Sequence, residues 1–119
     1  MPILGIGTDI VEIDRIREMI ERGAGFAERV FTQRELEYSM PKQTRFEHLA
    51  ARFSAKEAVA KALGQSFSWQ DVEMINNSDG KPDIVLHGRA KEVANGALVH
   101  VSVSHTRHYA SAVAVVEEP

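Results

Sequence analysis

The sequence predicts an α+β fold, with helices grouped in the first half of the chain and strands in the second half. The longest helical pattern runs from Thr44 to Leu63, and its alanine-rich second half has high helix propensity. Near the end of the chain, Val99, Val101 and Val103 alternate with polar residues, which is typical of a strand with one buried face. Because repeats and linkers are absent from the 119 residues, we expect one domain, 1–119.

The first half contains clear start and stop signals. A short buried strand is expected at residues 3–7, where it ends in glycines. A helix is expected from Val11, where isoleucines recur at helical spacing, to the glycines at 23 and 25. A capping box predicts a short helix after Thr32, and Gly64 is placed to end the long helix.

The second half is expected to form mainly antiparallel strands. The turn signal Asn76–Gly80 separates two expected strands, and a polar corner at residues 105–108 separates two more. The expected elements are strands at 68–76 and 84–86, a helix at 89–95, and strands at 99–104 and 109–116.

Composition excludes several classes of protein. The net charge is −3, from 14 basic and 17 acidic residues, which disfavours general nucleic-acid binding. The absence of cysteine excludes disulfides, thiolate nucleophiles and cysteine-type zinc sites. No apolar run approaches the ~20 residues of a membrane span, and no secretory leader is evident, so we expect a cytoplasmic protein without membrane association.

Asp9 is the first residue that stands out. It follows the glycine-punctuated strand directly, where ligands often gather, and hard cations such as Mg²⁺ bind carboxylate oxygen. The alternative is an N-cap for the following helix, which the positional preference of aspartate favours when Asp9 is considered alone.

Glu57 borders the apolar stripe of the long helix. At ~100° per residue it falls near Phe46 and Phe53. Lys61 follows one turn later, in the orientation that supports a Glu–Lys pair. The alternative to a functional role is a surface ion pair worth ~0.3–0.5 kcal/mol.

Three further groups have both an ordinary and a functional interpretation. His100, Ser102, Ser104 and His105 fit a solvated strand face, and Gly80-Lys81-Pro82 fits a hairpin turn whose backbone and lysine could approach a phosphate. The first helix presents a basic face that is either solvated or a docking surface for an acidic helical partner. This face consists of Arg15, Met19 and Arg22, with Phe26 beyond them.

Four segments in order resemble the motifs of the holo-acyl-carrier-protein synthases, the small type of 4'-phosphopantetheinyl transferase. They are Gly5-Ile6-Gly7-Thr8-Asp9-Ile10-Val11-Glu12-Ile13, the stretch from Arg52 to Gly64 (RFSAKEAVAKALG), Gly80-Lys81-Pro82, and His100-Val101-Ser102-Val103-Ser104-His105. Each segment alone is weak evidence for the family, but the order and spacing of all four together are specific to it. Phe31-Thr32-Gln33-Arg34-Glu35 adds a weaker likeness.

The resemblance implies a role for each matched position. Asp9 and Glu57 would hold Mg²⁺, and Lys61 would hold the phosphates of coenzyme A. Further coenzyme contacts would come from Arg52 and the turn Gly80-Lys81-Pro82, with His105 near the pyrophosphate. The catalytic residues would be Glu57, Lys61 and His105, with Glu57 the first and His105 the second candidate for the general base.

The resemblance also implies a long helix packed on a small antiparallel sheet, a homotrimer with sites between subunits, and an acyl carrier protein as partner. Family members often carry basic residues where this chain has Gly23-Ala24-Gly25, which weakens the expected docking surface. Thr106 stands where some relatives place an acidic residue, so a base is absent there.

Two other functions remain open from the residues alone. Two carboxylates and a lysine would equally serve a Mg²⁺-dependent phosphoesterase or nucleotide pyrophosphatase, with water replacing serine. A binding module that holds an acidic partner is the third possibility. The carrier's pathway, whether fatty-acid or polyketide synthesis or another, is not specified by the sequence.

Overall fold

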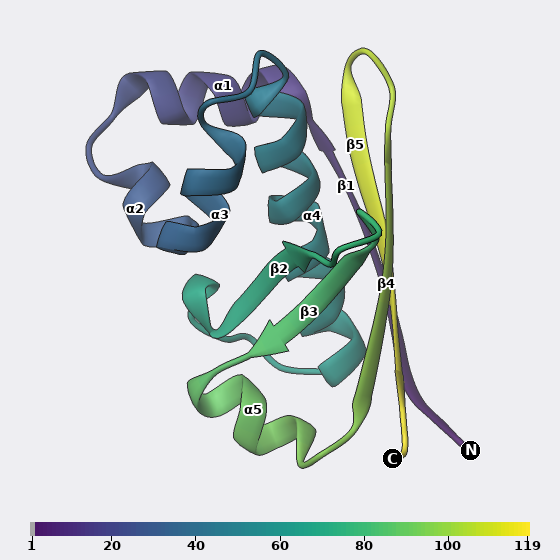
Figure 1. Ribbon diagram of the computed structural model, residues 1–119. Helices are drawn as coiled ribbons and strands as arrows, with labels where there is room; N and C mark the ends of the chain where they lie inside the picture. Colours follow the sequence, from purple (N-terminus) through teal and green to yellow (C-terminus); the bar gives the residue numbers. More distant parts are fainter. Residues whose placement is uncertain (1) are drawn as a thin grey trace.

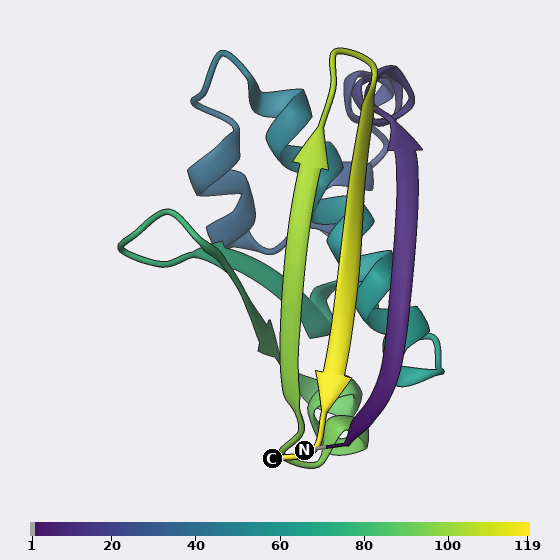
Figure 2. The same cartoon turned by 90° about the vertical axis from the view of Figure 1, so that its right-hand side faces the viewer.

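Helix α4 (Arg45–Leu63) runs along one face of a three-stranded antiparallel sheet in the computed structural model, which describes residues 2–119 (Figure 1). The strands have the order β1–β5–β4 and span Ile3–Glu12, Tyr109–Glu117 and Leu98–His105. Figure 2 shows the three strands side by side with α4 behind them. The predicted α+β class, with its long helix on an antiparallel sheet, is confirmed.

The smaller elements lie at the two ends of α4 and along its exposed side (Figure 1). They are α1 (Ile13–Arg22), α2 (Phe26–Val30) and α3 (Gln33–Ser39), a 3-10 turn at Trp69–Asp71, the hairpin of β2 (Val72–Asn76) and β3 (Pro82–Leu86), and α5 (Gly88–Ala94). Within residues 2–119, no helix is long and apolar enough to cross a membrane.

Two local predictions are confirmed by hydrogen bonds. At the start of α3, the Glu35 amide donates to Thr32 Oγ1 at 3.2 Å, and the Thr32 amide donates to Glu35 Oε1 at 2.9 Å. This reciprocal pair is the expected capping box. The long helix ends where expected, because Gly64 adopts a left-handed conformation with φ of 78°.

The first strand is longer than expected. It pairs with β5 as far as Glu12, opposite Tyr109, and α1 begins only at Ile13. The predicted strand end at Gly7 and helix start at Val11 were therefore wrong. Pairing with β5 continues past the glycines that were expected to end the strand, so Asp9 lies within β1, opposite Ala112. The strand expected from residue 68 likewise begins only at Val72, after the 3-10 turn.

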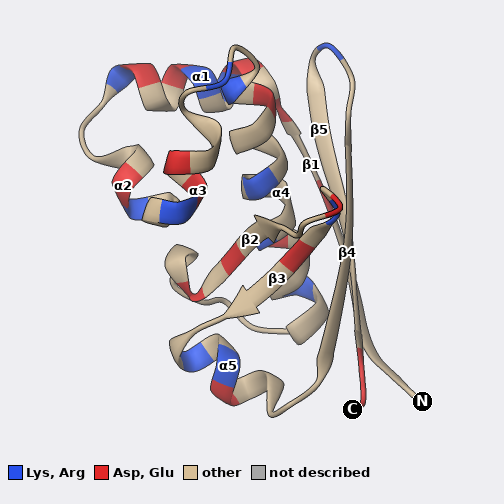
Figure 3. Ribbon diagram, in the orientation of Figure 1, with Lys and Arg blue, Asp and Glu red and all other residues tan. Residues whose placement is uncertain are grey.

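Small side chains fill the interface between α4 and the sheet. Ala58 and Val59 of α4 pack with Ala112, Ala114 and Val116 of β5, all of them buried. A second core cluster joins the first half of α4 to α1 and α2. Figure 3 shows that most charged residues lie on the helices and the β2–β3 hairpin, while the sheet is largely uncharged.

Two glycines let β1 lie directly against the backbone of α4. A Cβ atom on Gly7 would lie 2.0 Å from the carbonyl oxygen of Ala58, and one on Gly5 would lie 1.9 Å from that of Ala62. Real Cβ atoms do not approach a carbonyl oxygen so closely. Because successive side chains of a strand alternate between its faces, Asp9 lies on the same helix-facing side as both glycines.

Replacing Gly7 by alanine should therefore destabilise the protein, because the added methyl group can fit only if β1 moves away from α4. We expect Gly7→Ala to lower the free energy of unfolding by about 3 kcal/mol or more, the upper range for overpacking. Chemical denaturation measures this change. Thr8→Ala on the exposed face of the same strand is the control, and an equally stable Gly7→Ala variant would contradict the close contact.

Candidate functional site

Asp9 and Lys61 form the first part of the site. Lys61 Nζ lies 3.7 Å from Asp9 Oδ1 and donates a hydrogen bond of 3.0 Å to the Thr8 carbonyl oxygen. Ser54 Oγ donates to the Asp9 carbonyl oxygen at 3.0 Å, which fixes the strand on the helix. The alternative role of Asp9 as a helix N-cap is wrong, because Glu12 occupies the N-cap position of α1.

The second oxygen of Asp9 is buried and lacks a hydrogen-bond partner among the described residues. An unpaired buried carboxylate oxygen is costly, so a cation or another donor is expected beside it. The Asp9 side chain is only 15% exposed, and the ammonium group of Lys61 lies on its Oδ1 side.

Glu57 completes an acidic pair. It is half-buried, and burial raises the pKa of its carboxyl group; the negative charge of Asp9 raises that pKa further, while Lys61 opposes the change. The expected ion pair between Glu57 and Lys61 is replaced by the pair of Lys61 with Asp9. Two neighbouring carboxylates, one with an unpaired oxygen, fit a hard divalent cation such as Mg²⁺.

A cavity of about 630 Å³ opens beside these residues. One wall is the face of α4 that carries Glu57, Ala60 and Lys61, and the other is the segment from Gly64 to Trp69. The cavity therefore places a carboxylate and an ammonium group one helical turn apart on the same wall, where a phosphorylated ligand would meet both.

A buried ion pair that the sequence did not reveal adjoins the cavity through Lys56, which is one of the lining residues. Its Nζ lies 2.8 Å from Glu35 Oε1 and donates to the carbonyl oxygens of Trp69, at 3.0 Å, and Val72. Both side chains are almost fully buried. Burial lowers the pKa of Lys56, while the charge of Glu35 opposes this change. The pair joins α3, α4 and the second cavity wall.

Arg52 belongs to a different group of residues. It is 1% exposed, and its Nη2 donates to Asn76 Oδ1 at 2.7 Å. Asn76 Nδ2 in turn donates to the Gly80 carbonyl oxygen at 2.9 Å, which connects Arg52 to the turn Gly80-Lys81-Pro82. Arg52 Nε is buried without a hydrogen-bond partner among residues 2–119.

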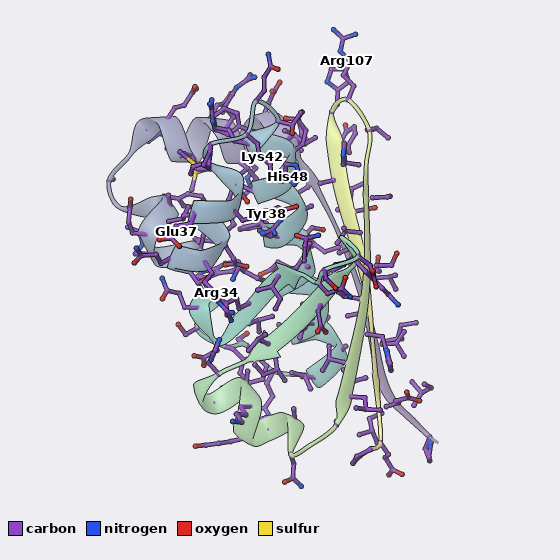
Figure 4. All side chains as sticks on the ribbon, in the orientation of Figure 1. Arg34, Glu37, Tyr38, Lys42, His48 and Arg107 are labelled. Carbon is purple, nitrogen blue, oxygen red and sulfur yellow. The ribbon has the colours of Figure 1, made fainter. Side chains whose placement is uncertain are left out.

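A basic cluster around Tyr38 extends this second group. Lys42 Nζ lies 4.4 Å and Arg52 Cζ 4.7 Å from the centre of the Tyr38 ring, and the His48 ring lies nearly perpendicular to that ring, with the two ring centres 5.7 Å apart. Figure 4 shows Tyr38, Lys42 and His48 lying together. Burial lowers the pKa of His48, and the charges of Arg52, Lys42 and His105 lower it further. Local sequence patterns did not reveal this cluster, because its members come from α3, from α4 and from the segment between them.

The structure separates the two groups within one chain. His105 ends β4, on the far side of β5 from Asp9 in β1, and it lies near His48 in the first turn of α4. Glu57 follows His48 by nine residues, roughly 13 Å along the helix axis. Asp9, Glu57 and Lys61 are thus brought together, whereas His105 and Arg52 are not brought to them.

The expected docking surface on α1 is only partly exposed. Arg15 and Arg22 are exposed and Met19 is half-buried. Phe26 is buried at 8% exposure and meets the Phe31 ring edge-on at 6.4 Å, so its side chain adds little to the surface.

Comparisons with known proteins show which proteins the chain resembles. The family model of the 4'-phosphopantetheinyl transferase superfamily matches residues 5–114. A holo-[acyl-carrier-protein] synthase of Caldanaerobacter subterraneus subsp. tengcongensis is 47% identical over 116 residues, which cover 92% of this chain and 91% of the relative.

Solved structures give the same result. The holo-(acyl-carrier-protein) synthase from Bacillus anthracis, in complex with CoA (3',5'-ADP), has a TM-score of 0.84 and 36% identity, covering 98% of each chain. The holo-[acyl-carrier-protein] synthase from Neisseria meningitidis has a TM-score of 0.87 and 33% identity, covering 98% of this chain and 100% of the other.

The family model and the curated relative each span nearly the whole chain, and the matched stretch contains Asp9, Glu57 and Lys61. The chain therefore belongs to the 4'-phosphopantetheinyl transferase superfamily, within the holo-[acyl-carrier-protein] synthase family of enzymes.

Proposed function

We propose that the chain transfers the 4'-phosphopantetheine arm of coenzyme A to a serine of an apo-acyl-carrier protein, with Mg²⁺, and releases adenosine 3',5'-bisphosphate. The observation that carries this proposal is the unpaired buried oxygen of Asp9, beside Glu57 and Lys61 and next to a cavity of about 630 Å³. The relative from Bacillus anthracis supports it, because that protein is in complex with CoA (3',5'-ADP).

Charge neutralisation is the first requirement of this reaction, because the diphosphate of coenzyme A repels a nucleophile. Bound Mg²⁺ would neutralise diphosphate charge and polarise the phosphoryl oxygens. Asp9 and Glu57 would hold the ion, and Lys61, exposed at the cavity wall, would bind the phosphate oxygens. Arg52 and the turn Gly80-Lys81-Pro82 are proposed as further coenzyme contacts.

The serine hydroxyl must lose its proton as it attacks. Its oxygen forms a bond to the β-phosphorus, and the bond from that phosphorus to the bridging oxygen breaks, so adenosine 3',5'-bisphosphate leaves with the bridging oxygen. Glu57 is the proposed acceptor of the proton, because its carboxylate lines the cavity in which the coenzyme would bind. His105 is the second candidate.

A homotrimer with sites between subunits is part of the proposal. The face of the sheet opposite α4 exposes Ile6 and Ile10 to 69% and 67%, together with Leu4 and Val113. Burying an isoleucine contributes ~1.5–3 kcal/mol, so a sheet face of this kind favours association. A neighbouring subunit could then bring His105 to Asp9 and Glu57, which one chain does not do.

The carrier protein would dock on α1. Arg15 and Arg22 are exposed cations, with Met19 between them, and they suit an acidic helix of the carrier. Phe26 would contribute only through its small exposed edge. We propose that the enzyme acts in the cytoplasm.

The central test combines the purified chain, apo-carrier, coenzyme A and Mg²⁺, followed by intact-protein mass spectrometry. We expect the carrier to gain the mass of one phosphopantetheine arm, and EDTA to abolish the gain. Consumption of coenzyme A without carrier would instead identify a phosphoesterase or pyrophosphatase. Binding of carrier with no reaction would identify a binding module.

Replacing Glu57 by glutamine should remove the negative charge of one proposed metal ligand and also the proposed general base. We expect Glu57→Gln to slow the transfer at least ~10²-fold, since a positioned base alone contributes ~10²–10⁴-fold. Initial rates and Mg²⁺ titrations measure the effect. Glu92→Gln on the exposed side of α5 is the matched control, and transfer by Glu57→Gln at the unmutated rate would refute the assignment.

Mixing two variants that are each expected to be slow tests whether the site spans two subunits. Glu57→Gln and His105→Ala, unfolded and refolded together, should recover up to about a quarter of the wild-type rate, because a quarter of random interfaces combine both intact residues. Rate measurements on the mixture, with the separately refolded variants as controls, give the result. Native mass spectrometry verifies that mixed oligomers have formed. If such oligomers recover no activity, sites shared between subunits are excluded.

A further inference from the structure

The two walls of the cavity differ in how firmly they are held. The α4 wall is part of the core, because Ala55, Ala58 and Val59 are fully buried. The opposite wall includes the pocket loop, defined here as residues 64–68. In this loop only Phe67 is half-buried, and the other four residues are exposed. A coenzyme bound in the cavity would therefore meet one fixed wall and one exposed wall.

Backbone hydrogen bonds hold the two ends of the pocket loop. The amides of Gly64 and Gln65 donate to the Ala60 carbonyl oxygen at 2.9 and 3.2 Å, and the Asp71 amide donates to the Ser68 carbonyl oxygen at 2.9 Å. These bonds leave the middle of the loop, around Ser66 and Phe67, to be held by other contacts.

Arg89 supplies those contacts. Its Nη1 donates to the Ser66 carbonyl oxygen at 2.8 Å, and its Nη2 donates to Gln65 Oε1. Its Cζ also lies 5.4 Å from the centre of the Phe67 ring, a cation–π distance. One guanidinium group thus contacts three successive residues of the pocket loop, all of which line the cavity, while Arg89 itself is not part of the lining.

The helix that carries Arg89 is well anchored. Ala90 and Ala94 of α5 are buried at 0% and 8% exposure, and the His87 amide donates to the Asp71 carbonyl oxygen at 2.8 Å. Arg89 therefore holds the pocket loop in a fixed position relative to α5. A lysine could not replace it fully, because an ammonium group lacks the planar fork that makes two hydrogen bonds while stacking on a ring.

We infer that Arg89 is a positioning residue for coenzyme A, which preorganises the pocket loop for binding without touching the reacting atoms. This inference rests on the proposed function, because it assigns the cavity to the coenzyme. A preorganised loop lowers the entropic cost of binding and acts equally on the ground and transition states. The loss of Arg89 should therefore weaken coenzyme binding and leave the chemical step unchanged.

The test compares wild type with Arg89→Ala and Arg89→Lys. We expect Arg89→Ala to raise the KM for coenzyme A about three- to tenfold with kcat within about twofold, the pattern of lost uniform binding. Arg89→Lys should lie between the two. Lys91→Ala, an exposed change on the same helix, is the control and should match wild type. Thermal unfolding of each variant verifies that the fold is intact.

A direct binding measurement separates this inference from the proposed function. Trp69, the one tryptophan of the chain, lines the cavity, so its fluorescence can report the Kd for coenzyme A without any carrier. A Kd raised in Arg89→Ala and partly restored in Arg89→Lys supports the inference even if transfer fails. An unchanged Kd and KM in Arg89→Ala, or a fall in kcat alone, would overturn the inference. Transfer of the phosphopantetheine arm by the wild-type protein would still support the proposed function.

Discussion

The direct contact between β1 and α4 is the constraint on which the site depends. Gly5 and Gly7 leave no side chain between the strand and the carbonyl oxygens of the helix, so the two backbones touch. Asp9 then reaches the neighbourhood of Lys61 and Glu57, which approach it from the helix. A strand held one side chain farther away would leave the two carboxylates too distant to share a cation, because metal–oxygen distances to Mg²⁺ are only about 2.0–2.1 Å.

Two consecutive residues of helix α4 have different roles, one in the fold and one in the candidate site. Lys56 is buried and paired with Glu35, whereas Glu57, the next residue, faces the cavity. A buried ion pair gains little net stability over apolar residues, but removing one partner leaves a costly unpaired charge. Here the pair also has a geometric effect, because the same ammonium group holds the carbonyl oxygens of Trp69 and Val72. The Trp69 end of the far cavity wall is thereby fixed to the helix that carries the proposed catalytic residues.

Local patterns predicted much of this fold, because the signals for the long helix, the capping box and the final hairpin lie within a few residues. The end of β1 was mispredicted because Gly5 and Gly7 resemble a strand end until β5 is placed beside them. The resemblance to a family predicted Asp9, Glu57 and Lys61 as site residues. The structure shows that they lie close together because Gly5 and Gly7 let β1 contact α4 directly. The pair of Lys56 with Glu35 and the cluster around Tyr38 join distant segments, so no local pattern could reveal them.

The distribution of the proposed functional residues within one chain argues for association. Asp9 lies on one edge strand and His105 on the other, with β5 between them, and residues so fixed cannot meet by a change of side-chain conformation. Yet both belong to motifs whose order and spacing resemble a single family. The exposed isoleucines of β1 lie on the sheet face away from α4, where a neighbouring copy could cover them without blocking the cavity. In the proposed homotrimer, the same association would bury this apolar face and complete each site, so folding stability and activity would depend on one interface.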